Sequence, residues 1–165
     1  MIRTSAYLIQ LVLLGQDLYN ERNLWMLRIL ICCGGGFSSS ALAGKVDKEI
    51  TANNLEEEVS ISFSPFSIAH ERADDYDVIM CCPHLKFAVH NIAKNKIQND
   101  VPIYILPPRM YGTMELQEVV QDAKDVISKF NKDPQNPIHF EGEENVMKIT
   151  RFKSYRNHYR LTEVN

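Results

Sequence analysis

The sequence predicts an α/β fold in which a four-stranded parallel sheet, with strand order 2-1-3-4, carries helices on both faces. Three observations support this prediction. Short apolar runs alternate with amphipathic segments, two of the runs are apolar almost throughout, and each run is followed closely by glycine or proline. Continuous apolar strands separated by helices are typical of a parallel sheet buried on both faces, and right-handed crossovers leave few topologies. Ligands of such sheets bind beyond the carboxyl ends of the strands.

The first strand is the apolar run 27–33, which ends in Cys32-Cys33 and leads into three glycines. Ser38 is a suitable cap for a helix running to about residue 52, since Leu42, Val46 and Ile50 recur on one face. A phosphate loop is therefore predicted directly after the first strand.

Three further strand and helix pairs follow. In residues 59–63 apolar side chains alternate with serines, as in an edge strand. The remaining elements are expected as a short helix over 67–73, a strand over 76–82, a helix from 83 to about 92, a strand over 101–106, a loop over 107–112 and a helix over 113–130.

Composition indicates a globular protein with one domain of this kind. The chain has 165 residues, 45% of them hydrophobic, and a net charge of −3, which argues against general nucleic-acid binding. No run approaches the roughly 18 apolar residues that span a bilayer. The four cysteines form two adjacent pairs, which resemble neither a secreted disulfide framework nor a metal knuckle, and the histidines are scattered. We expect a cytoplasmic protein without metal or cofactor.

We expect the α/β domain to cover residues 26–131. Residues 1–25 do not share its alternation, and we interpret them as an N-terminal extension that is either an extra helix or not part of the native protein, with the second favoured. Residues 132–165 form a polar, then basic, C-terminal tail. Aromatic residues are interleaved with its cations, a pattern also found in segments that touch anionic membranes or nucleic acid, but we interpret the tail as a solvated extension.

The loop after the first strand has the composition of an anion-binding nest around a nucleophile. Glycines allow successive backbone N–H groups to turn inward, and a helix N-terminus adds further donors. The same field stabilises a thiolate, so Cys33 is the predicted nucleophile. The predicted phosphate-binding residues are Gly34, Gly35, Gly36, Phe37, Ser38, Ser39 and Ser40.

Known phosphate motifs do not match this loop. Gly44-Lys45 is followed by valine and lacks the first glycine of a P-loop, and the glycine spacing is wrong for a dinucleotide fingerprint. In a Cys-x5-Arg phosphatase the arginine would stand at Ser39. Without its guanidinium the transition state lacks a bidentate clamp, so the loop is predicted to accept and hold a phosphoryl group rather than to hydrolyse it.

The segment Cys33 to Leu42 resembles the Cys-x-x-Gly-Met-Ser-Thr-Ser-x-Leu signature of the enzyme IIB component of the bacterial sugar phosphotransferase system, lactose/cellobiose class. The resemblance extends from Met26 to about Phe130 and includes the Pro83-His84 and Tyr111-Gly112 steps. It implies a phosphocarrier in which the cysteine takes phosphate from a phosphohistidine of the IIA partner. The phosphoryl group then passes to a sugar held by the membrane component IIC.

Four residues near the predicted strand ends are accessory candidates: Cys82, His84, Arg109 and Tyr111. Cys82 stands where the resembled family often has glycine, and we hypothesise that oxidation links it to Cys33. Cys32 and Cys81 are assigned to the core, because they point away from Cys33 and Cys82 by the period of two. Two other functions are weighed: a low-molecular-weight thiol phosphatase or arsenate-reductase-like enzyme, and a regulatory binding module without catalysis.

Overall fold

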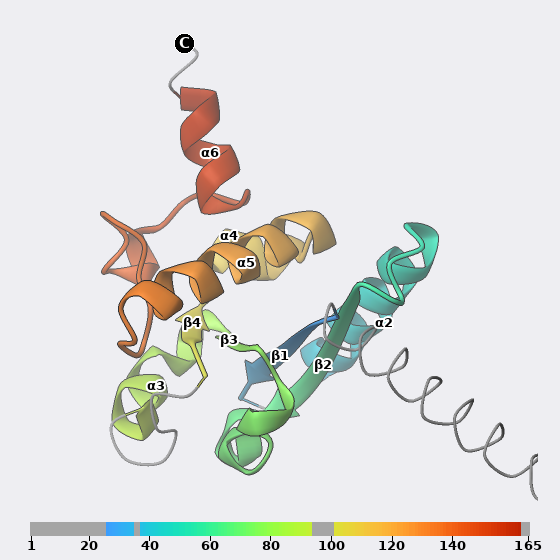
Figure 1. Ribbon diagram of the computed structural model, residues 1–165, viewed down its shortest axis with the longest axis horizontal. Helices are drawn as coiled ribbons and strands as arrows, with labels where there is room; N and C mark the ends of the chain where they lie inside the picture. The colour runs from blue at the N-terminus through green and yellow to red at the C-terminus, as the bar shows by residue number, and fades with distance from the viewer. Residues whose placement is uncertain (1–25, 35–36, 94–100, 163–165) are drawn as a thin grey trace, which may run out of the picture.

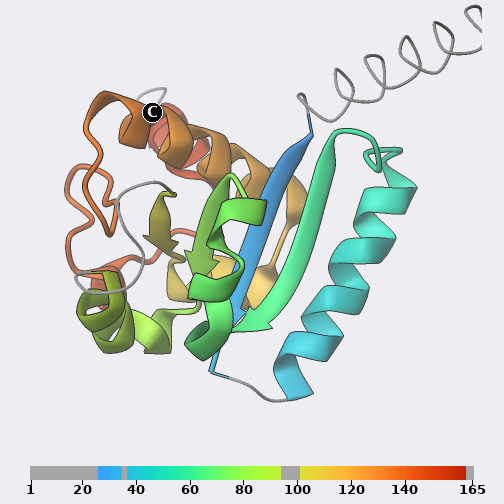
Figure 2. The same cartoon turned by 60° about the horizontal axis from the view of Figure 1, so that its bottom comes forward.

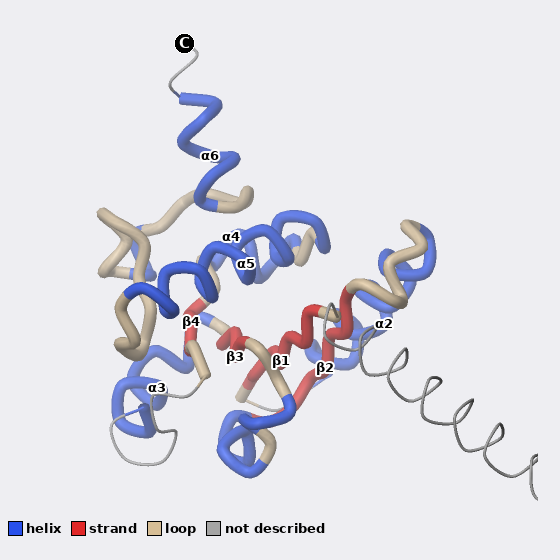
Figure 3. The backbone as a smooth tube through the Cα atoms, in the orientation of Figure 1, coloured by secondary structure: helices blue, strands red, loops and turns tan. Residues whose placement is uncertain are grey.

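The computed structural model describes residues 26–34, 37–93 and 101–162, and shows a parallel sheet between two helical layers (Figure 1). The predicted extension 1–25 lies outside the described residues. The strands are β1 (Leu27–Cys33), β2 (Val59–Pro65), β3 (Val78–Cys81) and β4 (Ile103–Ile105), and the order across the sheet is β2-β1-β3-β4. The predicted fold class, strand order and edge position of β2 are confirmed, and Figure 3 shows the four strands side by side in the middle of the molecule.

Strand β1 is central because it pairs in parallel with both β2 and β3. Leu27 to Cys33 faces Val59 to Pro65 residue by residue, and Cys32 is opposite Cys81. Figure 2 shows β1 between β2 and β3, with α2 (Phe37–Ala52) on the far side of β2. All four strands therefore end at one edge of the sheet.

Each face of the sheet has its own core. Ile29 and Ile31 pack against α2 and α5 (Leu116–Lys132), whereas Leu30 and Cys32 pack against the opposite layer. That layer contains α3 (Lys86–Ala93) and the 3-10 turns η1 (Phe66–Glu71), η2 (Ala73–Asp75), η3 (Pro83–Leu85) and η4 (Val146–Lys148). Alternating residues of a buried strand point to opposite faces, which explains the division.

The segment after β4 differs from the predicted loop over 107–112. It is a short helix, α4 (Pro108–Thr113), which begins after Pro107 and ends at Met114 in the left-handed conformation. Pro108 is compatible with the helix because the first turn has no need of its missing N–H. The side chain of Met110 is fully buried in the α2 and α5 core, so packing also favours the helix.

Residues 133–162, which follow α5, are part of the folded structure rather than a solvated extension, which corrects our interpretation of this part of the C-terminal tail. Asn136 bonds through its side chain to the backbone of Ile103 and Val101, and Ile138 forms a parallel bridge with Tyr104. These residues cover the free edge of β4. The segment ends in α6 (Tyr155–Thr162), which packs on α5.

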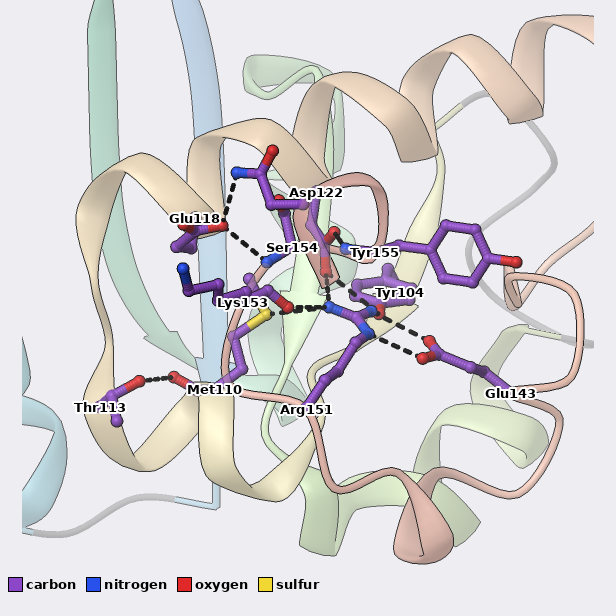
Figure 4. Close-up of polar contacts among 11 residues, drawn as sticks. Tyr104, Met110, Thr113, Glu118, Asp122, Glu143, Arg151, Lys153, Ser154 and Tyr155 are labelled. Atoms are coloured by element: carbon purple, nitrogen blue, oxygen red, sulfur yellow. Dashed lines mark hydrogen bonds and ion pairs between the residues drawn. The ribbon is translucent and has the colours of Figure 1, made fainter. Parts of the chain in front are cut away.

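A buried arginine holds this C-terminal segment in place (Figure 4). Arg151, only 2% exposed, donates from Nε and Nη2 to both carboxylate oxygens of Glu143, at 2.7 and 3.0 Å. Its Nη1 lies 2.8 Å from Asp122 of α5, and its Nη2 lies 2.6 Å from the hydroxyl of Tyr104. A desolvated guanidinium needs such partners, since an unpaired buried charge is very costly.

Asp122 also supports the start of α6. Its Oδ1 accepts a hydrogen bond from the backbone N–H of Tyr155 at 2.7 Å, and Glu118 accepts one from the N–H of Ser154 at the same distance. Carboxylates at a helix N-terminus satisfy its free donors and interact favourably with its dipole. Burial raises the pKa of Asp122 to about 6, although Arg151 and the Tyr155 N–H oppose this rise.

Two negative findings concern the described residues. None of the helices in this part of the chain is both long enough and apolar enough to cross a bilayer. No group of three or more histidine, cysteine, aspartate or glutamate side chains within it is arranged to bind a metal ion.

We expect Arg151→Met to lower the free energy of unfolding by about 3 to 5 kcal/mol, because it leaves two carboxylates buried without their cation. Arg156→Gln is the matched control: it removes an exposed ion pair to Asp125 and should cost less than about 1 kcal/mol. Urea denaturation followed by circular dichroism measures both values. Equal losses for the two variants would contradict the assigned role of Arg151.

The pKa of Asp122 predicts a pH dependence of stability. Between the ordinary pKa of 3.8 and about 6, the folded chain holds a proton that the unfolded chain has released. The contribution of Asp122 to the free energy of unfolding therefore falls as pH rises through this range and is constant above it. NMR titration of the aspartate carboxyl carbons, with Asp122→Asn assigning the signal, should give a midpoint near pH 6; a midpoint below pH 4 would contradict the prediction.

Candidate functional site

The predicted site lies where β1 and β3 end. The N–H of Cys82 donates to the carbonyl of Cys32 at 2.8 Å, which continues the parallel pairing one step past β3. This pairing brings Cys33 and Cys82 to the same edge of the sheet. The turn before α2 and the start of η3 follow directly from these two cysteines.

Cys33 is the most exposed of the four cysteines, at 6%, whereas the other three have no exposed surface. All four are free thiols. Cys32 and Cys81 belong to the core between the sheet and α3, as predicted from strand alternation. Burial raises the pKa of the Cys81 thiol well above its ordinary value, and its hydrogen bond with Cys32 adds to the rise. The Cys81 thiol is therefore a protonated packing group, and Cys32 packs beside it in the same core.

The loop that follows Cys33 is described only in part. Gly34 is exposed and has open space around its α-carbon, while Gly35 and Gly36 lie outside the described residues. Helix α2 begins at Phe37, so Phe37, Ser38, Ser39 and Ser40 form its first turn. The helix is found beside the loop as expected, but it begins one residue before the predicted cap, so Ser38 lies in its first turn and is not its cap. The amide cradle from Gly34 to Ser40 stays a prediction.

The sequence predicted that Cys82 lies at the end of a strand, but not which groups surround its sulfur. Burial raises the pKa of its thiol, while hydrogen bonds from the backbone N–H groups of Gly34 and Leu85 lower it and the neighbouring Cys33 raises it further. The Cys82 sulfur thus contacts the first residue of the glycine loop and the start of the α3 layer. This proximity to Cys33 fits the disulfide hypothesis, which itself stays a prediction.

Two accessory candidates from different loops lie together. The ring of His84, in η3, is perpendicular to that of Tyr111, in α4, with 6.0 Å between ring centroids. His84 is exposed and Tyr111 is half-buried. Arg109 is exposed on α4, and no ion pair to it is found among the described residues. Candidate residues from three segments therefore lie at the carboxyl end of the sheet: the end of β1, the end of β3 with η3, and α4.

Sequence reasoning missed the residues that join α2 to α4 and α5. Lys45 Nζ donates to the carbonyl of Thr113, and Glu49 accepts a hydrogen bond from the N–H of Leu116 at 2.9 Å. Both side chains lie away from the apolar face formed by Leu42, Val46 and Ile50, on the polar side of the helix. No local signal indicated these contacts, because the partners are 68 and 67 residues away.

Comparison with known proteins adds an independent finding. The family described as "PTS system, Lactose/Cellobiose specific IIB subunit" matches residues 28–122, which is more than half of the chain. No protein among those with curated descriptions matches.

The solved structures similar to this chain include two IIB proteins. The cellobiose-specific phosphotransferase IIB component from Borrelia burgdorferi has 28% identity and a TM-score of 0.50, over 63% of this chain and 94% of its own. The lactose-specific IIB domain from Streptococcus pneumoniae has 14% identity and a TM-score of 0.41, over 67% of this chain and 99% of its own. On the family match, with the α/β fold and a cysteine at the predicted strand end, the chain belongs to the lactose/cellobiose-specific IIB subunit family of the phosphotransferase system.

Proposed function

We propose that this chain is a phosphocarrier in which Cys33 accepts a phosphoryl group from a phosphohistidine of a IIA component and passes it to a sugar bound by a membrane IIC component. The observation that carries the proposal is the position of Cys33. It is the one cysteine with exposed surface among the described residues, and it stands between a parallel strand and the start of α2. Membership of the IIB family supports IIA and IIC components as partners.

The transfer consists of two displacements at phosphorus. The Cys33 thiolate attacks the phosphohistidine in line, so that an S–P bond forms while the N–P bond breaks and the electron pair returns to the imidazole of the donor. A sugar hydroxyl then attacks the phosphocysteine, an O–P bond forms, and the S–P bond breaks to regenerate the thiolate. The hydroxyl proton leaves to a base on the acceptor side. Backbone N–H groups of the glycine loop and α2 would hold the phosphoryl oxygens.

The same site explains why transfer is favoured over hydrolysis. A thiol phosphatase with the Cys-x5-Arg pattern would need a guanidinium at Ser39, and the chain has serine there. Arg109 is on another element, α4, and is exposed. Without a clamp on the equatorial oxygens, attack by water receives little help.

Exposed apolar side chains at the same edge suit a transient protein contact. Phe87, in the first turn of α3, is 72% exposed, and Ile68, in η1, is 41% exposed. Both elements follow the ends of strands. In the proposed function these side chains form part of a small contact surface, because partners that must dissociate quickly make small interfaces.

We expect phosphorylation of Cys33 when the chain is incubated with phosphoenolpyruvate, the general phosphotransferase proteins and a IIA component. Cys33→Ala should reduce phosphoryl incorporation roughly a thousandfold or more, because the nucleophile is lost. Cys32→Ala, at the adjacent core position, is the matched control and should keep incorporation. Intact-mass and peptide mass spectrometry measure the product, and a phosphoryl group on another residue, or none, would refute the proposal.

We expect Cys33 to be alkylated by iodoacetamide before the other three cysteines, because their sulfurs have no contact with solvent in the folded chain. Digestion and mass spectrometry after short exposure give the order of labelling. Labelling in urea, where all four thiols are accessible, is the control. Equal rates for Cys33 and Cys81 in the folded protein would contradict the assignment.

A further inference from the structure

The groove between α5 and α6 lies outside the proposed phosphoryl site. It has a volume of about 550 Å³, within the range of small-molecule pockets. One wall is formed by the last two turns of α5, and the other by α6 with Phe140. All of the lining residues lie beyond residue 122, where the family match ends.

The groove is strongly basic. Lys129 and Lys132 line it from α5, and Arg156 and Arg160 line it from α6. Asp125 is the one carboxylate among its lining residues and pairs with Arg156 at 2.5 Å. Within the described part of the chain, no ion pair is found for Lys129, Lys132 or Arg160. Three positive charges therefore stay unneutralised around one groove, and an anion with several charges would complement them.

Three aromatic rings in contact with one another also line the groove. Phe140 and Tyr155 are stacked, with 4.5 Å between their centroids and 19° between their planes. The ring of Tyr159 lies 4.6 Å from that of Tyr155 and is tilted by 51°, and the ring of His158 stands nearly perpendicular to Tyr159 at 5.0 Å. Phe140 is buried, Tyr155 is half-buried and Tyr159 is 41% exposed, so the three rings extend from the core to the surface of the groove. A planar ring of a ligand can stack on the partly exposed ring of Tyr159.

The two features together favour one class of ligand. Inorganic phosphate or an acidic peptide would use the cations but not the rings, and a flat anionic bilayer would not enter a groove between two helices. We propose that the groove between α5 and α6 binds a nucleoside phosphate, with the base on Tyr159 and the phosphates on Lys132, Arg160 and Lys129. Arg and Lys bind phosphate oxygens by charge-assisted hydrogen bonds, which suits this arrangement.

Calorimetric titration of the full chain with ATP tests the proposal. Adenosine measures the contribution of the base alone, and tripolyphosphate measures that of the negative charges alone. We expect ATP to bind more tightly than either. Lys132→Gln with Arg160→Gln should weaken ATP binding roughly tenfold, and Tyr159→Ala should do so by a similar factor. Lys48→Gln with Lys124→Gln removes two exposed cations elsewhere and should change binding less than about twofold.

Cys33→Ala separates this site from the phosphoryl site, and its ATP binding should equal that of the unchanged chain. Four results would overturn the proposal: no ATP binding at millimolar concentration, tripolyphosphate binding as tightly as ATP, loss of ATP binding in Cys33→Ala, or equal weakening in the control variant. Binding of phosphatidylglycerol vesicles without ATP binding would assign the basic face to a membrane instead. Circular dichroism of each variant establishes that α6 is still folded.

Discussion

The parallel pairing of β1 with both of its neighbours is the constraint on which the rest of the structure depends. Because the register from Leu27 to Cys33 is continuous with β2, and Cys32 is opposite Cys81, every strand ends at one edge. Cys33 and Cys82 therefore become neighbours although they are far apart in sequence. In a parallel sheet this edge also receives the helix N-termini, which is why the cysteine and the predicted anion nest share one turn.

Much of the fold could be predicted from local periodicity. Continuous apolar runs gave buried strands, the Leu42, Val46 and Ile50 spacing gave α2, and serine alternation placed β2 at an edge. Local patterns failed where packing decides the conformation. The segment 107–112 contains two prolines and a glycine and was expected to be a loop, yet burial of Met110 makes α4 a helix.

Long-range electrostatic contacts could not be predicted from the sequence. Arg151 stands in a basic run that is typical of a solvated face, and its carboxylate partners at Asp122 and Glu143 are 29 and 8 residues away. Nothing in the spacing distinguishes it from Arg156, which is exposed. The contact of the Cys82 sulfur with Gly34 could not be predicted either. Strand alternation placed Cys82 at the strand end, but only the fold shows that the N–H of Gly34 lies against its sulfur.

The C-terminal segment and the carboxyl edge of the sheet are connected through α4. Arg151 Nη1 lies 3.5 Å from the sulfur of Met110, and Met110 precedes Tyr111, whose ring meets that of His84 beside the Cys33 turn. Lys45 fixes the other end of α4 to α2 through Thr113. One six-residue helix therefore contacts the buried arginine through Met110, His84 through Tyr111 and α2 through Thr113. Since closely packed side chains leave little free volume, the position of α4 depends on the C-terminal segment as well as on the sheet, and the family fold and the segment beyond it share one packed core.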